Sequence, residues 1–124
     1  GLYLNWNCLR GEIYYIDFGE NMGSEESGIR PALVIQNDKG NKYSNTIIVA
    51  SITTKIDKRH IPTHYKLNHR CGIKKDSLNL LEQIRAVDKK RITKYICKLS
   101  DKQMTEIYKL IHISLGLDCN DEEK

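Results

Sequence analysis

The order of the predicted strands and helix along the chain restricts its fold more than any other feature, because short β-type runs come first and one helical pattern follows near the end. The run from Thr46 to Thr53, T-I-I-V-A-S-I-T, is dominated by β-branched residues and follows turn-forming residues, so it predicts a strand, which we expect to be central. Similar patterns predict strands at Leu9–Phe18, Ala32–Gln36, His64–Leu67, Ser77–Val87 and Thr93–Leu99. This order favours an antiparallel, partly barrelled sheet with a helix on one face, a mainly β fold with α, over a doubly wound α/β fold.

The helical pattern near the end has signals for both its start and its stop. Ser100 and Gln103 form a capping box, in which each side chain satisfies a backbone N–H of the other residue. Gly116 follows where a left-handed C-terminal cap is expected. The apolar residues between these signals recur at spacings of three and four over about four turns, and they are Met104, Ile107, Tyr108, Ile111 and Leu115. We expect this stripe to pack on the sheet or on a partner subunit.

The connections between the predicted strands are polar. The segment Gly19–Ile29 has three glycines and no apolar period, which predicts an exposed, mobile loop. Pro31 follows at the entry to the second strand, where its missing N–H is tolerated. Asn37–Asn41 predicts a turn, and Asp88–Arg91 predicts a short helical turn.

Chain length and composition predict one compact domain. The 124 residues are enough for a single core, which we place at residues 9–117 of one domain spanning 1–124, and residues 118–124 are expected to fray. Hydrophobic residues make up 40% and charged residues 29%, which is ordinary for a soluble globular protein. Neither a membrane-spanning segment nor a signal peptide is recognised, so we expect a cytoplasmic protein.

The residues that commonly bind metals are not arranged as a metal site. The cysteines are spread along the chain as Cys8, Cys71, Cys97 and Cys119. They form no C-x-x-C pair, so we expect neither zinc nor another cofactor. His60, His64 and His69 crowd one segment without metal-ligand spacing, and we interpret them as ordinary strand or loop residues.

Six short blocks of sequence occur in a recognisable order. They are Arg10–Tyr14, Gly23–Glu25 with Gly28–Pro31, Val34–Asp38 with Gly40–Ser44, Ile48–Thr53, Leu80–Arg85 and Ile113–Leu117. One block alone is weak evidence, but the ordered set is specific. Together the blocks resemble the MazF/PemK family of toxins over residues 10–117, most closely its Gram-positive branch. The resemblance implies the small CcdB/PemK-type antiparallel β-barrel with a C-terminal helix.

Two residues are the candidates for catalysis. Arg30 lies between the predicted loop and the second strand, where its planar guanidinium can contact a phosphate through two parallel hydrogen bonds. Thr53 ends the strongest predicted strand and can donate a hydrogen bond to the same oxygens. The resemblance implies that these two residues carry catalysis. The alternatives are a surface salt bridge from Arg30 to Glu25 or Glu26, and ordinary strand packing for Thr53. If Arg30 is dispensable, His64 is the first substitute.

Four polar residues are candidates for reading unstacked RNA bases, because they offer mixed hydrogen-bond donors and acceptors. They are Ser24, Glu25, Asn37 and Gln83. The alternative is that they are ordinary solvated residues. The basic run Lys89–Arg91, with Lys94 and Lys98 beyond it, is either an RNA-backbone patch or a solvated turn.

The resemblance implies the toxin of a type II toxin-antitoxin system. Such a protein is a metal-independent, sequence-selective endoribonuclease, cutting single-stranded RNA, mainly messenger RNA, to 2′,3′-cyclic phosphate and 5′-hydroxyl ends. It also implies a homodimer and an acidic MazE-like antitoxin peptide, which the net charge of +4 suits. Two rivals remain: a CcdB-like poison of DNA gyrase, because fold does not fix function, and a non-catalytic module that binds RNA or peptide.

Overall fold

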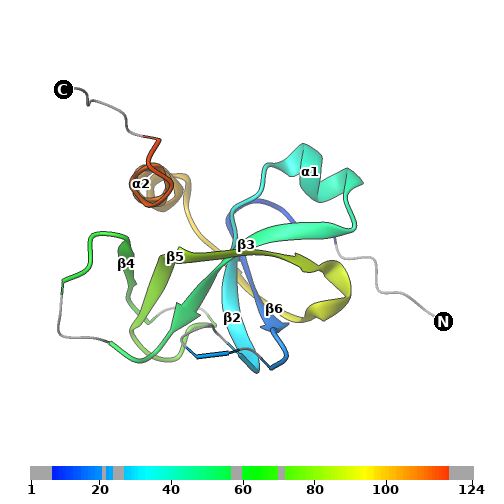
Figure 1. Ribbon diagram of the computed structural model, residues 1–124, viewed down its shortest axis with the longest axis horizontal. Helices are drawn as coiled ribbons and strands as arrows, with labels where there is room; N and C mark the ends of the chain where they lie inside the picture. Colours follow the sequence, from blue (N-terminus) through cyan, green and yellow to red (C-terminus); the bar gives the residue numbers. More distant parts are fainter. Residues whose placement is uncertain (1–6, 21, 24–26, 57–59, 70–71, 118–124) are drawn as a thin grey trace.

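The computed structural model describes residues 7–20, 22–23, 27–56, 60–69 and 72–117, and it contains one sheet with three short to medium helical segments (Figure 1). The elements in chain order are β1 (Glu12–Asp17), β2 (Ile29–Val34), α1 (Asp38–Tyr43), β3 (Thr46–Thr53), β4 (His64–Leu67), β5 (Ser77–Asp88), the 3-10 helix η1 (Lys89–Arg91), β6 (Ile92–Lys98) and α2 (Asp101–Ser114). The predicted tail at 118–124 lies outside the described residues.

All strand pairs in the sheet are antiparallel, in the order β4-β5-β3-β2-β1-β6. The strands curve strongly around one another, with β4 and β6 as the edge strands (Figure 1). Within the described residues no ladder joins β4 to β6, so the sheet is barrel-like but open. The predicted mainly β class, the antiparallel sheet, the central position of β3 and the late helix are confirmed.

The curved sheet carries a hydrophobic cluster on each of its faces, because successive side chains of a strand point to opposite sides. One cluster includes Ile13, Leu33 and Ile52 and is covered by α2 through Met104 and Ile107. We call this the helix-covered face. The other cluster, on what we call the opposite face, contains Tyr14, Ile16, Phe18, Ala32, Val34 and Val49.

The structure corrects the predicted start and end of the second strand. β2 begins at Ile29 rather than Ala32 and ends at Val34 rather than Gln36, so Pro31 lies inside the strand. Pro31 pairs with Tyr15 of β1, whereas the ladder between β2 and β3 begins only at Ala32. The proline therefore occupies a part of β2 that has a ladder on one side, where its missing N–H leaves no ladder bond unmade.

The prediction of a simple turn at Asn37–Asn41 is wrong, because α1 forms there. The Asn37 side chain accepts a hydrogen bond from Gly40 N at 2.8 Å and caps the helix. Asn41 is buried and donates to Gln36 O at 2.9 Å, which fixes the short helix to the end of β2. Local capping and one buried amide thus stabilise a helix too short to show periodicity.

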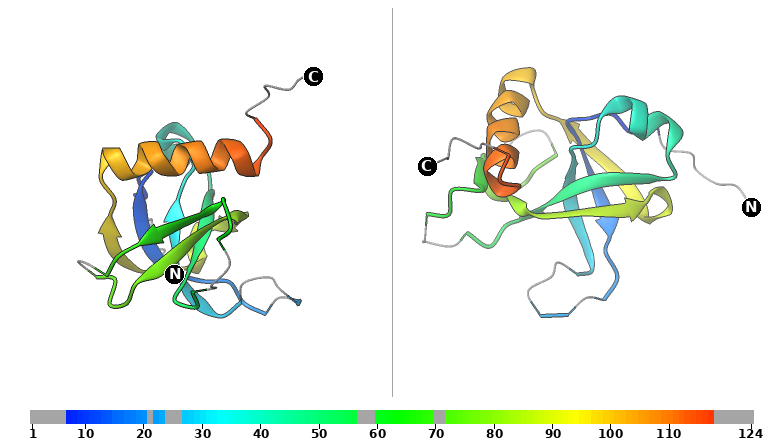
Figure 2. Two further views of the ribbon diagram at one scale, coloured as in Figure 1. Left: turned by 90° about the vertical axis from the view of Figure 1, so that its left-hand side faces the viewer. Right: turned by 45° about the horizontal axis from the view of Figure 1, so that its top comes forward.

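The C-terminal helix α2 begins and ends where predicted, but Tyr108 and Leu115 of its predicted apolar stripe are more than half exposed. Both hydrogen bonds of the Ser100 and Gln103 capping box are present, and Gly116 follows the helix at φ +67°. Met104, Ile107 and Ile111 pack against the sheet, while Tyr108 is half exposed at 51%. α2 lies across the strands and contacts β5 and β4 (Figure 2). No helix in the described part of the chain is long and apolar enough to span a bilayer.

Candidate active site

Arg30 is placed by β2, close to the end of the strand that is remote from α1. It pairs with Ile16 of β1, and its Nε donates to Ser27 O at 2.7 Å. This hydrogen bond orients the guanidinium relative to the β1–β2 connection, which extends from this end of the sheet (Figure 2). The alternative partners Glu25 and Glu26 lie outside the described residues.

Thr53 is the last residue of β3 and is almost fully buried, with 9% of its surface exposed. Its Oγ1 accepts a hydrogen bond from Lys55 N at 3.1 Å, which closes a local turn as the chain leaves the sheet. Within the described residues this hydroxyl donates to no protein acceptor, so its proton remains available for a ligand oxygen. The buried side chain is therefore held in place while its donor function is preserved.

Arg30 and Thr53 lie on the same face of adjacent strands, at the same end. The β2–β3 register pairs Val34 with Val49 and Ala32 with Ser51. The ladder ends at Ala32 and Ser51; continued by two positions, its register sets Arg30 across from Thr53, and side chains two residues apart on a strand share a face. Strands are about 4.8 Å apart, so both side chains are within reach of one phosphate.

The same row of the opposite face continues across β5 to the edge strand β4. Thr53 pairs with Leu78 of β5, and Leu78 pairs with Lys66 of β4. Lys66 is exposed and shares the face of Arg30 and Thr53, at about two strand spacings from Thr53, or roughly 10 Å. Sequence reasoning missed Lys66, because only the β4–β5 register places it in this row.

His64 lies two residues before Lys66 on β4, and its side chain is hydrogen-bonded to Glu82. It pairs with Leu80 of β5, and its Nε2 lies 2.7 Å from Glu82 Oε2. Thr63 Oγ1 donates to the other carboxylate oxygen of Glu82 at 3.0 Å. An ionised carboxylate only accepts hydrogen bonds, so His64 Nε2 is the donor to Glu82. The buried Nδ1 of His64 has no hydrogen-bond partner among the described residues. The sequence indicated His64 as a substitute catalyst but not its partner Glu82.

Of the four residues predicted to read bases, the structure describes Asn37 and Gln83. Asn37 caps α1 at the opposite end of β2 from Arg30, with its Oδ1 occupied by Gly40 N. Gln83 is half-buried in the part of β5 where the pairing with β3 is irregular. The β3–β5 register shifts there, between Ala50 and Ile52. Ser24 and Glu25 lie outside the described residues. Gln83 is therefore the described candidate nearer to Thr53.

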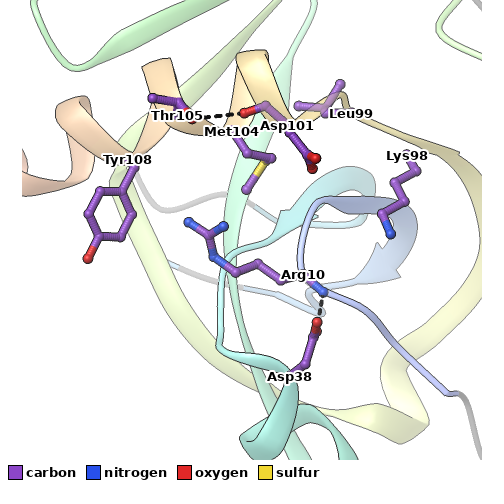
Figure 3. A pocket seen from close by; sticks show the side chains of 8 residues that line it. All are labelled: Arg10, Asp38, Lys98, Leu99, Asp101, Met104, Thr105 and Tyr108. Atoms are coloured by element: carbon purple, nitrogen blue, oxygen red, sulfur yellow. Dashed lines mark hydrogen bonds between the residues drawn. The ribbon is translucent and has the colours of Figure 1, made fainter.

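A hollow of about 440 Å³ lies between α2, α1 and the end of β6 (Figure 3). Arg10 extends into it with its guanidinium 5.4 Å from the ring centre of Tyr108, and its backbone N donates to Asp38 at 2.6 Å. Lys98 and Asp101 add one charge of each sign to the lining. The hollow adjoins α1, at the end of β2 opposite Arg30, and its mixed charges favour no single class of ligand.

The described residues that could hold a metal are not gathered at one place. Among the described residues, no three His, Cys, Asp or Glu side chains lie close enough together to bind an ion. What the candidate site offers is a guanidinium and a hydroxyl, with a further ammonium in the same row. These are donors that can stabilise negative charge on phosphate oxygens.

The sequence has identifiable relatives. Residues 9–115 match the family described as the PemK-like, MazF-like toxin of type II toxin-antitoxin systems. The chain is 51% identical over 109 residues to the endoribonuclease MazF of Staphylococcus saprophyticus, covering 87% of this chain and 91% of that protein. The match therefore extends over nearly all of both proteins.

Solved structures share the fold at lower identity. MazF of Deinococcus radiodurans superposes with a TM-score of 0.77 at 20% identity, over 90% of this chain and 98% of that one. A mycobacterial endoribonuclease in complex with its cognate antitoxin gives a TM-score of 0.73 at 22% identity, over 90% and 98% of the two chains. These likenesses establish the barrel-like architecture with its C-terminal helix.

Proposed function

The chain belongs to the family of PemK-like, MazF-like toxins of type II toxin-antitoxin systems, and we propose that it cleaves single-stranded RNA at Arg30 and Thr53. Endoribonuclease activity is the function of the relative with 51% identity over most of both chains. The residue assignment is supported by the β2–β3 register, which, continued past its last paired residues, sets Arg30 and Thr53 on one face at the same end of adjacent strands. Messenger RNA is the proposed substrate, which places the protein in the cytoplasm.

The proposed reaction is an internal transesterification of RNA. The ribose 2′-oxygen forms a bond to the adjacent phosphorus while the bond from phosphorus to the 5′-oxygen breaks. The 2′-hydroxyl proton passes to water, and the departing 5′-oxygen takes up a proton from water. The products are a 2′,3′-cyclic phosphate and a 5′-hydroxyl. Neither a protein nucleophile nor a metal is needed.

Arg30 and Thr53 contribute charge and hydrogen bonds to this reaction. A guanidinium stays protonated at neutral pH, so Arg30 acts as a clamp on the phosphorane oxygens rather than as a base. The Thr53 hydroxyl donates a hydrogen bond to the same group of oxygens. Fixed donors aimed at developing charge each contribute roughly 10²- to 10³-fold to the rate. The Nε bond to Ser27 O orients the Arg30 guanidinium before substrate arrives.

The test is cleavage of a mixed transcript pool in the presence of EDTA, with sequencing of the new RNA ends. We expect cuts at one short sequence motif, 5′-hydroxyl ends, and rates lowered at least 100-fold by Arg30→Ala and by Thr53→Val. Thr53→Ser keeps the hydroxyl and is expected to retain activity. Circular dichroism must show that each variant is folded. Cleavage by folded Arg30→Ala at the normal rate would remove Arg30 from the mechanism and make His64 the next candidate.

The rival activities give different outcomes in the same assays. A gyrase poison would trap cleaved DNA on gyrase and leave RNA intact, and a binding module would retain RNA without cutting it. A wild-type protein that fails to cut RNA would therefore contradict the proposal.

The proposed assembly is a homodimer that is inhibited by an acidic antitoxin peptide. α2 leaves Tyr108, Ile113 and Leu115 half exposed at 49–56%, which provides apolar surface for a second copy. The net charge of +4 suits an acidic segment lying across the RNA-binding surface. Sedimentation at several protein concentrations tests the dimer, and competition between such a peptide and RNA tests the inhibition.

A further inference from the structure

We propose that a pocket on the helix-covered face, behind Arg30 and Thr53, binds a nucleotide of the RNA strand next to the scissile phosphate. The inference rests on the proposed function, because it assigns a further part of the same substrate. The pocket has a volume of about 250 Å³ and is lined by residues of β1, β2, β3, β6 and the segment between β4 and β5.

The floor and walls of the pocket are apolar. Ile52 and Ile73 are buried members of the cluster under α2, and they form part of the lining. Pro31 and the half-buried Tyr15 pair with each other on adjacent strands and line it as well. An aromatic ring beside aliphatic side chains is the kind of surface on which an unstacked base packs.

The rim of the pocket is polar and positively charged. Lys74 and Lys75 are exposed and line it, as does the exposed Thr54. In the described part of the chain, neither lysine has an ion pair, and the hydroxyls of Tyr15 and Thr54 have no hydrogen-bond partner. The neighbouring carboxylate of Asp76 is hydrogen-bonded to His69, because Asp76 Oδ1 accepts from the backbone N of His69 at 2.8 Å. The rim therefore offers unengaged donors to an anion.

The segment that carries the lysines is held in place at its start. Gly72 has φ +81° and approaches β6 so closely that an added Cβ would lie 2.8 Å from Ile96 O. Only glycine fits such a contact in this conformation. Ile73 then inserts into the core, and Ser77 Oγ donates to Lys75 O at 2.9 Å. Lys74 and Lys75 are thus presented from an anchored backbone.

The pocket and the catalytic pair lie on the two different faces of the sheet, at the same end. Pro31 follows Arg30 in β2 and Ile52 precedes Thr53 in β3, and adjacent residues of a strand face opposite sides. An RNA strand that bends over the ends of β2 and β3 can place its scissile phosphate on the opposite face and a neighbouring base in the pocket. The lysines then lie beside the phosphate of that nucleotide.

The chemistry favours a nucleotide over a peptide. The volume is below the roughly 300–1,000 Å³ of sites that enclose a whole small ligand, and it suits one base whose sugar and phosphate stay outside. Aliphatic and aromatic walls bind the base, and two ammonium groups bind the phosphate. An acidic peptide would use the lysines but would gain little from the Tyr15 ring.

The experiment measures binding of the full-length protein to an RNA oligonucleotide that contains the mapped cleavage motif. A 2′-deoxy sugar at the cut site prevents attack. Abasic sites are then introduced one position at a time on both sides of the cut, with wild-type protein, Tyr15→Leu and Tyr15→Phe. We expect one flanking position at which loss of the base weakens wild-type binding about fivefold or more, but has little effect on Tyr15→Leu. Tyr15→Phe retains the ring and should retain most of the effect.

The double variant Lys74→Ala/Lys75→Ala tests the phosphate contact. Its slope of log affinity against log salt should be smaller by about 0.7, because the two lysines contact one phosphate and each neutralised phosphate on a single strand contributes about 0.7. Its KM should rise while kcat stays close to that of the wild type. The control is Lys102→Ala/Lys109→Ala, which removes two exposed lysines from α2.

Each outcome decides between the pocket and its alternatives. If no abasic position is coupled to Tyr15, or if the Lys74/Lys75 variant binds RNA like the control, the pocket assignment is overturned while RNA cleavage stands. If the variant loses affinity only for a synthetic peptide of alternating Glu and Leu, the pocket binds peptide and the proposal is wrong. If the wild-type protein does not cleave RNA, the proposed function itself fails.

Discussion

Gly72 and Ile96 are in closer contact than any other residue type at position 72 would permit. A Cβ at Gly72 would lie 2.7 Å from Ile96 Cγ2 and 2.8 Å from Ile96 O, and the backbone there has φ +81°. This contact joins the segment between β4 and β5 to the edge strand β6, across the side where the sheet has no ladder. The missing side chain at Gly72 therefore lets the segment between β4 and β5 approach β6 closely, and Gly72 and Ile96 both line the proposed nucleotide pocket.

Gly72→Ala is expected to lower the free energy of unfolding by about 2–5 kcal/mol. A left-handed conformation costs an alanine about 1–2 kcal/mol, and overpacking against backbone adds about 1–3 kcal/mol. The matched control is Gly28→Ala, because Gly28 has φ +75° but nothing within 4 Å of its added Cβ. Urea unfolding of both variants measures the difference. Equal losses in the two variants would show that the contact with Ile96 is unimportant.

Asp76→Asn is expected to remove part of the acid sensitivity of the protein. The backbone N–H of His69, and then its side chain, lower the pKa of Asp76 from its ordinary value of 3.8. A carboxyl whose pKa is lower in the folded state stabilises the protein above its unfolded pKa, and this contribution is lost as the pH falls below 3.8 through the folded value. Urea midpoints of wild type and variant should therefore converge as the pH falls below that value. A constant difference at every pH would contradict this linkage.

Ser100→Ala is expected to destabilise α2 by about 1 kcal/mol, which is typical for removal of an N-cap. The Ser100 hydroxyl accepts from Gln103 N at 3.1 Å, and Gln103 Oε1 accepts from Ser100 N at 3.0 Å. Thr105→Ala is the control, because it also removes an exposed helical hydroxyl but leaves the cap intact. The midpoint temperature of thermal unfolding should fall for Ser100→Ala and stay unchanged for Thr105→Ala. An equal fall of the midpoint in Thr105→Ala would argue against a specific contribution of the cap.

Most of the fold could be predicted from the sequence because its signals are local. The β-branched run at Thr46–Thr53 and the Ser100 cap determine β3 and the start of α2 without reference to the rest of the chain. α1 was missed, because six residues show no periodicity and its stability depends on the buried Asn41. The true start of β2 was missed, because Pro31 is tolerated only where β3 has not yet begun to pair.

The candidate site was predicted less completely, because it depends on strand register. Arg30 and Thr53 were identified from the blocks of sequence that contain them, and their joint role in catalysis stays a prediction. The row that adds Lys66, and the pairing of His64 with Glu82, follow from the β4–β5 ladder. A ladder joins residues that are far apart in sequence, and a shift of one residue would move each side chain to the other face.

Arg30→Lys is expected to lower kcat for RNA cleavage about 100-fold while changing KM little. Lysine keeps the positive charge but loses the planar fork of donors and the Nε bond to Ser27 O, so the charge is no longer held in one orientation on the phosphorane. Substrate affinity depends mainly on charge, and that is unchanged. Arg10→Lys is the control, because Arg10 lies beside Tyr108 at the other end of β2. Steady-state cleavage of a fluorogenic RNA measures both constants. Wild-type kcat in Arg30→Lys would mean that a point charge is sufficient at this position, and the clamp geometry would have to be abandoned.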